Sequence, residues 1–317
     1  MLALPRWLLR ASAAGAARRF ASAAVEPRPA PVTLFAFRCG SLRTQTQRVL
    51  RDTRHGEPME IPVTFFVVRR GHEWVAFDTG CNVLVAGDDP AAAAAHWGAK
   101  VVLAYAPRMR AEDEFQAQLL RAFGLRPADL RLLALSHGHL DHAGAVGNLA
   151  GTGVPVLMQA SELAAVRAEL AHVRATGAAS AGAAGAYIAG DFARIDELRL
   201  EAPGGDGVLD IFGDASVVLF PSPGHSPGHQ SMLVRTTAAE GGAGKTYILT
   251  GDAAYTLENL ERAIAPGLAF DFKQALQSLL MFKVLRSVHP RRVVVVPSHD
   301  PAFWASKPLA PAPFVVD

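Results

Sequence analysis

Three histidines and one aspartate lie within six residues of one another, directly after an apolar run at 130–135. They are His137, His139, Asp141 and His142. Burying so many imidazole and carboxylate groups without partners would be costly. In an extended segment, residues two apart point the same way, so His137 and His139 can bind one metal ion together. This spacing predicts a metal site, which constrains any fold that the chain adopts.

Three further ligand candidates each follow an apolar run. His225 follows 216–220, Asp252 follows 246–249, and His299 follows 292–296. Ligand sites in α/β sheets form outside the carboxyl ends of strands, so we expect these side chains to meet the histidine cluster. Five imidazoles and two carboxylates exceed the needs of one tetrahedral ion and predict two ions with Asp252 as the bridge. Nitrogen and oxygen ligands without thiolate favour zinc, with manganese, iron or cobalt as alternatives.

The remaining pattern predicts an α/β architecture with layered sheets. Short β-rich runs predict strands at 32–37, 61–68, 73–77, 130–135, 155–158, 216–220, 230–234, 246–249 and 292–296. We expect the first strand to end at Cys39 and Gly40. The Ala/Gly-rich stretch 175–190 predicts a loop or lid.

Apolar periodicity predicts helices at 112–123, 161–174 and 271–286. Phe115, Leu119, Leu120 and Phe123 are expected on one face of the first helix. Phe272, Leu276 and Leu279 are expected on one face of the last helix, with Asp271 as its cap.

Composition favours one large domain, residues 31–317, after a leader at 1–30. The chain has 317 residues, half of them hydrophobic, and a net charge of +2, so no nucleic-acid partner is expected. Cys39 and Cys81 are too few for a disulfide scaffold and lack the close spacing of a thiolate zinc site. We expect two buried thiols or one incidental bridge. Isolated histidines are expected to be packed or solvated: His55, His72, His96, His172 and His289.

The leader is rich in arginine and alanine and contains one acid, Glu26. This composition is typical of an organelle transit peptide, while a disordered extension is the alternative. Arginines interrupt its apolar stretches, so no integral membrane segment is expected. In a bacterium we expect a cytoplasmic protein, and in a eukaryote a mitochondrial or other organellar one. A small-molecule substrate is the expected partner, and a homodimer stays open.

The cluster at 136–144 resembles the HxHxDH signature of the metallo-β-lactamase superfamily. Segments 78–80, 223–229, 251–252 and 298–300 resemble its other motifs, in the same order. This resemblance implies a four-layer αβ/βα sandwich. Within the superfamily the sequence is most similar to the N-acyl-homoserine lactonases, through segments 39–42, 251–259 and 297–301. The leader and the Ala-rich stretches at 91–95 and 175–186 depart from that pattern.

The resemblance implies a role for each matched residue. His137, His139 and His225 would bind one metal ion and Asp141, His142 and His299 the other, with Asp252 shared. His229 would contact a ligand rather than a metal, and Asp78 would orient a ligand histidine. Tyr255 would donate its hydroxyl to a substrate carbonyl, with ordinary packing as the alternative.

We therefore expect a hydrolase with two zinc ions that opens a lactone ring, and the resemblance implies N-acyl-homoserine lactones as its substrates. A hydroxide between the metals would attack the carbonyl, and Asp141 would pass a proton to the leaving alkoxide. One rival is a thioester hydrolase of the glyoxalase II type, although only 18 residues follow His299 here. A rival from another class is a non-catalytic metal-binding protein, which would not need Tyr255.

Overall fold

A computed structural model describes residues 30–316, apart from 52, 54, 88, 182–185, 238–243 and 289. Predictions about the leader and His289 therefore lie outside the described residues, apart from Ala30. The strands are β1 (Val32–Gln45), β2 (Pro58–Arg70), β3 (Glu73–Phe77), β4 (Leu132–Ala134), β5 (Pro155–Leu157), β6 (Ser180–Ala181), β7 (Tyr187–Ile188), β8 (Arg199–Glu201), β9 (Leu209–Asp210), β10 (Val217–Pro221), β11 (Gln230–Arg235), β12 (Thr246–Leu249) and β13 (Val293–Val296). The α-helices are α2 (Thr46–Val49), α3 (Pro90–Trp97), α4 (Ala99–Tyr105), α5 (Phe115–Phe123), α6 (Ala160–Thr176), α7 (Leu257–Arg262), α8 (Phe272–Val288) and α9 (Pro301–Trp304).

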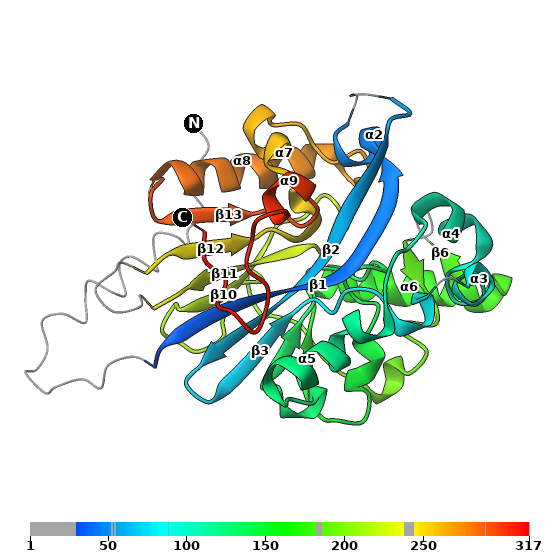
Figure 1. The fold of residues 1–317 in the computed structure, drawn as a ribbon, viewed down its shortest axis with the longest axis horizontal. Coiled ribbons are helices and arrows are strands. Elements are labelled where there is room, and N and C mark those ends of the chain that lie inside the picture. Colours follow the sequence, from blue (N-terminus) through cyan, green and yellow to red (C-terminus); the bar gives the residue numbers. More distant parts are fainter. Residues whose placement is uncertain are drawn as a thin grey trace, which may run out of the picture.

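Two mixed sheets form the centre of the molecule. A six-stranded sheet has the order β1-β2-β3-β4-β5-β8, and a five-stranded sheet has the order β13-β12-β11-β10-β9. The pairs β3–β4 and β12–β13 are parallel, whereas β1–β2 and β10–β11 are antiparallel. Figure 1 shows α8 beside β13 on one side of the molecule and α5 on the opposite side.

Alternate residues along the strands pack into different cores. On β10, Val217 and Leu219 face the core between the sheets, whereas Val218 and Phe220 face the outer core against α8. On β1, Leu34 lies between the sheets, while the outer face of the sheet packs on α3 to α6. Both faces of each sheet are buried, which explains the continuous apolar runs in the sequence. The layers therefore run helix, sheet, sheet, helix, and the predicted αβ/βα sandwich is confirmed.

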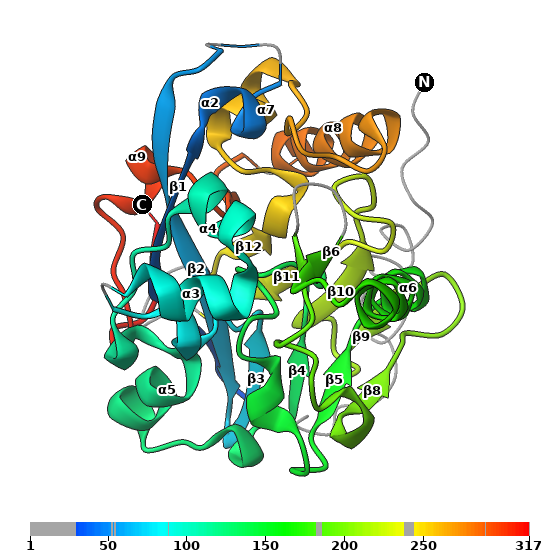
Figure 2. The same ribbon diagram turned by 90° about the vertical axis from the view of Figure 1, so that its right-hand side faces the viewer.

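Helices α3, α4 and α6 cover the outer face of the six-stranded sheet in Figure 2. Trp97 of α3 and Val101 of α4 are buried in that core. The sequence pattern did not predict α3 and α4. The stretch 175–190, predicted to be a loop or lid, instead contains the end of α6 and the short strands β6 and β7 among its described residues.

Three local predictions are wrong. Strand β1 does not end at Gly40 but continues to Gln45 through a register shift between Arg38 and Ser41. Glu114 interrupts the helix predicted at 112–123, because its side chain caps α5 by accepting from the N–H of Ala117. Leu120 is 57% exposed, so it does not share the buried face of α5.

On α8 the buried face also differs from the predicted one. Phe272 and Leu276 are partly exposed, and the face is formed by Ala275, Ser278, Leu279, Phe282 and Leu285. The predicted cap is present, since Asp271 Oδ1 accepts from the N–H groups of Lys273 and Gln274 at 2.8 and 3.0 Å.

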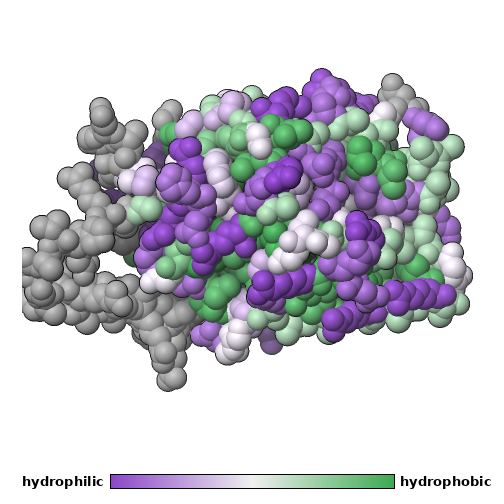
Figure 3. Space-filling view, turned by 90° about the horizontal axis from the view of Figure 1, so that it is seen from below, coloured by the Kyte–Doolittle hydropathy of each residue, from purple (hydrophilic) through white to green (hydrophobic). Residues whose placement is uncertain are grey.

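The face of the molecule in Figure 3 shows no patch that marks a binding site for another protein. Hydrophilic and hydrophobic residues are mixed over its described part, so this face does not mark an extended apolar interface. The homodimer stays a prediction. Within the described residues, no helix combines the length and the apolar character needed to cross a membrane.

Candidate metal centre

Four strands direct their carboxyl ends to one region between the two sheets. The segment with His137, His139, Asp141 and His142 follows β4 of the six-stranded sheet. The other three residues follow strands of the five-stranded sheet: His225 after β10, Asp252 after β12 and His299 after β13. Parallel pairing of β12 with β13 places the last two side by side. The structure therefore brings all seven predicted ligands together.

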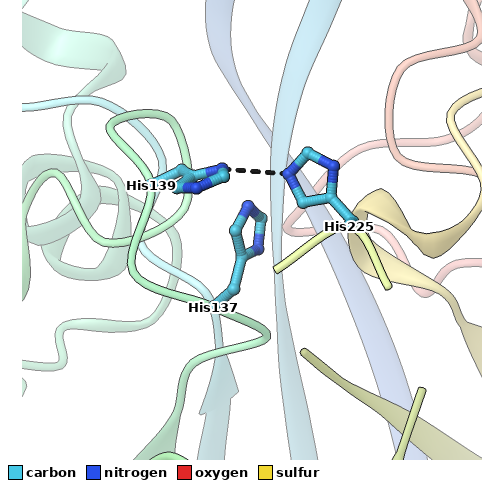
Figure 4. A group of neighbouring side chains, drawn as sticks. All are labelled: His137, His139 and His225. Atoms are coloured by element: carbon cyan, nitrogen blue, oxygen red, sulfur yellow. Dashed lines mark hydrogen bonds between the residues drawn. The ribbon is translucent and has the colours of Figure 1, made fainter. Parts of the chain in front are cut away.

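The first group consists of His137, His139 and His225. Ligand atoms of these three residues lie within 4.8 Å of one another. Figure 4 shows their rings converging on one point, with His139 Nδ1 and His225 Nε2 at 2.9 Å. The ring centroids of His137 and His139 are 4.3 Å apart, as expected for neighbours that point the same way. Three imidazoles that converge in this way could together hold one metal ion.

The second group consists of Asp141, His142 and His299, also with ligand atoms within 4.8 Å of one another. His299 Nε2 lies 3.4 Å from Asp141 Oδ2, and His142 Nε2 lies 3.8 Å from Asp141 Oδ1. Asp141 is the most exposed of the three, at 8%. One carboxylate therefore faces the opening of this group.

Asp252 lies between the two groups. Its Oδ1 is 3.0 Å from His142 Nε2 and 2.9 Å from His299 Nε2. Its Oδ2 is 3.4 Å from His225 Nε2 and 3.8 Å from His137 Nε2. Each carboxylate oxygen thus faces one group, which is the geometry of a carboxylate shared between two ions.

The chemistry of these atoms fits metal ions. The Nε2 atoms of His137, His142 and His299 are buried and make no hydrogen bond of good geometry, although the Asp252 carboxylate lies near all three. Burial, together with the neighbouring imidazoles, lowers the pKa of His137 and His139 well below 6.5. The neutral imidazole is the form that binds a metal. Burial alone would also lower the pKa of His142, but the carboxylates of Asp252, Asp141 and Asp78 outweigh it and raise that pKa.

Contacts behind the ligands fix their orientation. Asp78 accepts from His142 Nδ1 at 2.8 Å, from the N–H of Ser136 at 2.6 Å and from its hydroxyl at 2.9 Å. This is the orienting position predicted for Asp78. His299 Nδ1 lies 2.8 Å from the carbonyl oxygen of Pro62. A hydrogen bond on the far ring nitrogen leaves Nε2 free to bind a metal.

His229 lies behind Asp252 and outside both groups. Its Nε2 accepts from the N–H of Asp252 at 3.0 Å, and its Nδ1 lies 2.9 Å from the hydroxyl of Ser222. With both ring nitrogens occupied, His229 contacts the Asp252 segment and belongs to neither group, which agrees with the prediction that it touches a ligand candidate rather than a metal.

Other predicted residues lie away from the centre. Cys39 and Cys81 are free and buried, so of the two expected states the unbridged one is found. His55, His72 and His172 are exposed. His96 is instead paired with Asp191, at 2.8 Å between Nε2 and Oδ1.

A pocket of about 200 Å³ opens onto the two groups. His139, Asp141, His225 and Asp252 form its floor. Its walls are mainly apolar and include Leu42, Ile61, Leu140, Leu268 and Phe270, with Arg48 and Glu169 as charged members. A mostly apolar pocket with a few polar groups at one end suits a small substrate with an apolar part.

Tyr255 is buried at the floor of this pocket. Its ring centroid is 4.9 Å from that of His299 and 5.7 Å from that of His225. Burial raises its pKa well above 10, and the negative charges of Asp252 and Asp141 act in the same direction. The hydroxyl therefore keeps its proton at neutral pH and can serve as a donor.

Sequence reasoning missed Glu162 and Tyr187. Glu162, in the first turn of α6, is fully buried and bonds to both ligand-bearing loops. Tyr187 packs edge-on against His139, with ring centroids 4.7 Å apart. Neither residue belongs to a spacing motif, and a glutamate at a helix start is normally read as an exposed capping residue.

The family model described as the metallo-beta-lactamase superfamily matches residues 60–299. The chain belongs to this superfamily. It is 33% identical over 282 residues to the N-acyl homoserine lactonase AttM of Azorhizobium caulinodans, with 88% of this chain and 97% of the relative covered. It is 30% identical to AttM of Agrobacterium fabrum over the same coverage.

Solved structures of the superfamily share the fold. An N-acyl homoserine lactone hydrolase with the product N-hexanoyl-L-homoserine at its catalytic metal centre has a TM-score of 0.71 and 23% identity, covering 90% of this chain and all of the other. The dizinc quorum-quenching lactonase AidC has a TM-score of 0.54 and 13% identity, with 92% and 96% covered. The predicted superfamily and the predicted likeness to the lactonases are confirmed.

Proposed function

We propose that this chain is a metal-dependent hydrolase with two zinc ions that opens lactone rings, with N-acyl-homoserine lactones as the substrate class. The observation that carries the proposal is the position of the pocket, whose floor contains members of both ligand groups and the shared Asp252. The relatives named as N-acyl homoserine lactonases support this substrate class.

In this proposal the ligand set is divided as the geometry suggests. His137, His139 and His225 would hold one ion, Asp141, His142 and His299 would hold the other, and Asp252 would be shared between them. Two divalent ions there would lower the pKa of a coordinated water toward about 7 and polarise the substrate carbonyl. Nitrogen and oxygen ligands without thiolate favour zinc, with manganese, iron or cobalt as alternatives.

Protein groups then act on the substrate. The hydroxyl of Tyr255 donates a hydrogen bond to the carbonyl oxygen as negative charge develops on it. Asp141, the most exposed member of its group, takes a proton from the attacking water and transfers it to the leaving alkoxide oxygen as the ring opens. The apolar walls, with Leu140 and Phe270 among them, hold the acyl chain of the substrate and keep water away from it.

The test is an assay of residues 31–317 on N-acyl-homoserine lactones of several chain lengths, with a glutathione thioester in parallel. We expect lactone opening that a chelator abolishes and zinc restores. The Asp252→Asn variant, which lacks the shared charge, is the matched inactive control. Thioester turnover without lactone turnover would move the function to the glyoxalase II class. Bound metal without turnover of either substrate would favour a non-catalytic protein.

A further inference from the structure

The Glu162 carboxylate lies between the two loops that carry the first ligand group. It is fully buried. Its Oε1 accepts from the N–H of Gly138 at 2.9 Å and from the hydroxyl of Tyr187 at 3.0 Å. Its Oε2 accepts from the N–H of Gly228 at 2.9 Å and from the hydroxyl of Ser226 at 2.6 Å. All four donors are uncharged, so the group is not half of an ordinary ion pair.

The residues bonded to Glu162 are neighbours of the three histidines. Gly138 separates His137 from His139, and Ser226 directly follows His225. Tyr187 packs against the ring of His139. The Glu162 carboxylate therefore bonds to residues adjacent in sequence to each of the three histidines, and also to the tyrosine that packs on the ring of His139.

Close packing makes this arrangement specific to the start of α6. A Cβ atom added at Gly228 would lie 2.1 Å from the backbone nitrogen of Glu162. A Cβ atom added at Gly138 would lie 2.6 Å from Val166 Cγ2, one helical turn further along. Both loops are thus pressed against α6 at glycines, and the positive end of the helix dipole favours a carboxylate there.

The second ligand group has different supports. His142 is oriented by Asp78, and His299 by the carbonyl of Pro62. The bonds of Glu162 reach neither residue. Moreover, Glu162 is not among the described residues that line the pocket, so it acts on the ligands and not on the substrate.

We propose that Glu162 is a positioning residue that sets the metal affinity of the three-histidine site alone, leaving the Asp141–His142–His299 site unchanged. This inference rests on the proposed two-ion centre. The amide of a Glu162→Gln variant has a single acceptor oxygen, so it can accept hydrogen bonds from only one of the two loops. Its NH2 group then faces the donors of the other loop and cannot accept from them. Loss of such a contact behind a ligand typically weakens metal binding about 10- to 100-fold.

The experiment titrates the metal-free protein with Zn²⁺ against a chelating dye and obtains the number of ions and the Kd of each. For the wild type we expect two ions. For Glu162→Gln we expect one unchanged Kd and one about 10- to 100-fold weaker. Titration of the metal-free variant with Co²⁺ identifies the weakened site, because the visible absorption of the three-histidine site should appear only at higher Co²⁺ concentration than in the wild type.

Two further variants separate positioning from general stability. Glu114→Gln is the matched control, since Glu114 is also buried and accepts bonds at the start of a helix, here α5, away from the metals. It should lower the Tm without changing either Kd. Ser226→Ala removes one of the four donors and should weaken the same ion by a smaller factor. If Glu162→Gln does not fold, Ser226→Ala decides the question.

Unchanged values of Kd in both Glu162→Gln and Ser226→Ala would overturn the inference, as would equal weakening of both ions. A wild-type protein that binds fewer than two ions would instead refute the proposed two-ion function, whatever the variants do.

Discussion

At the scale of single residues, Tyr255 offers the most direct test of the chemistry. It lines the pocket, and its ring lies beside those of His225 and His299. We expect Tyr255→Phe to lower kcat about 100-fold, because removing one donor to a developing oxyanion has an effect of about this size. Metal content, measured in the same preparation, should not change.

Tyr105 provides the control for this substitution. It lines the same pocket and is buried, and burial, with the negative charge of Asp141 acting in the same direction, raises its pKa to about 12. Tyr105→Phe should affect KM more than kcat. Equal losses of kcat in the two variants would show that Tyr255 acts only by packing.

Asp191 lies outside the metal centre and makes the stability of the protein depend on pH. Burial raises its pKa from 3.8 to about 6, against the lowering effect of hydrogen bonds from His96 and Asn82. The folded state therefore binds a proton more tightly than the unfolded state does. This contribution is fully present below pH 4 and is lost as the pH rises through 6.

The shift corresponds to about 3 kcal/mol. Between pH 4 and pH 7 the free energy of unfolding of the wild type should therefore fall by about 3 kcal/mol relative to Asp191→Asn. Urea unfolding of both proteins across this range, with chelator present throughout, measures the difference. A difference that stays constant, or moves in favour of the wild type, would contradict the assignment.

At the scale of elements, the loop before His225 and helix α8 are in direct contact. Gly224 has a φ of +130°, and a Cβ atom there would lie 2.0 Å from the backbone nitrogen of Ala275. We expect Gly224→Ala to lower the free energy of unfolding by about 3 kcal/mol, since it combines backbone strain with overpacking.

Gly213 is a matched control, because its φ is +73° but nothing lies within 4 Å of an added Cβ atom. Gly213→Ala should lower the free energy of unfolding by only about 1 kcal/mol, the effect of strain without a clash. Urea unfolding of the two variants gives the comparison. If Gly224→Ala is no less stable than Gly213→Ala, α8 can move away without penalty and does not hold the His225 loop.

The same contact explains why the sequence predicted the wrong face of α8. Counting large apolar residues selected Phe272 and Leu276, which are partly exposed. The buried face instead includes Ala275, which faces Gly224, and Ser278, whose hydroxyl donates to the carbonyl of Pro223. Small residues are needed where a loop approaches a helix closely, and hydrophobic periodicity does not register them.

Strand β1 shows a second limit. Gly40 was read as the end of a strand, but it lies within the register shift of a continuous one. An added Cβ atom there would lie 2.2 Å from the carbonyl oxygen of Arg108, so the glycine permits a close backbone approach. By contrast, β3 and β12 have their predicted bounds, because buried strands bordered by turns can be predicted from the local sequence alone.

The metal-ligand candidates could be predicted from the sequence for a similar reason. Each follows an apolar strand, and ligand sites in α/β proteins form outside the carboxyl ends of strands. Glu162 could not be found in this way, because its partners are backbone N–H groups and hydroxyls that come from three distant segments. Only the folded chain brings those donors together.

At the scale of the whole molecule, the ligand groups join the two sheets. His137, His139, Asp141 and His142 follow a strand of the six-stranded sheet, while His225, Asp252 and His299 follow strands of the five-stranded one. Each proposed ion would therefore bind residues from both sheets. Without metal, the Nε2 atoms of His137, His142 and His299 stay buried between the sheets, with the Asp252 carboxylate as their charged neighbour.

Removing the metal should therefore destabilise the entire fold and not a single loop. An ion present at about 1,000 times its Kd stabilises the native state by about 4 kcal/mol, so two ions contribute about 8 kcal/mol. For a chain of this size, 1 kcal/mol corresponds to about 2 °C, so a chelator should lower the Tm by about 15 °C. Calorimetry with and without chelator measures the change, and added zinc should restore the original Tm.

The Asp252→Asn variant should show a smaller change in Tm, because it lacks the charge shared between the sites. A Tm that the chelator leaves unaltered in the wild type would mean that the seven residues do not hold metal across the sheets.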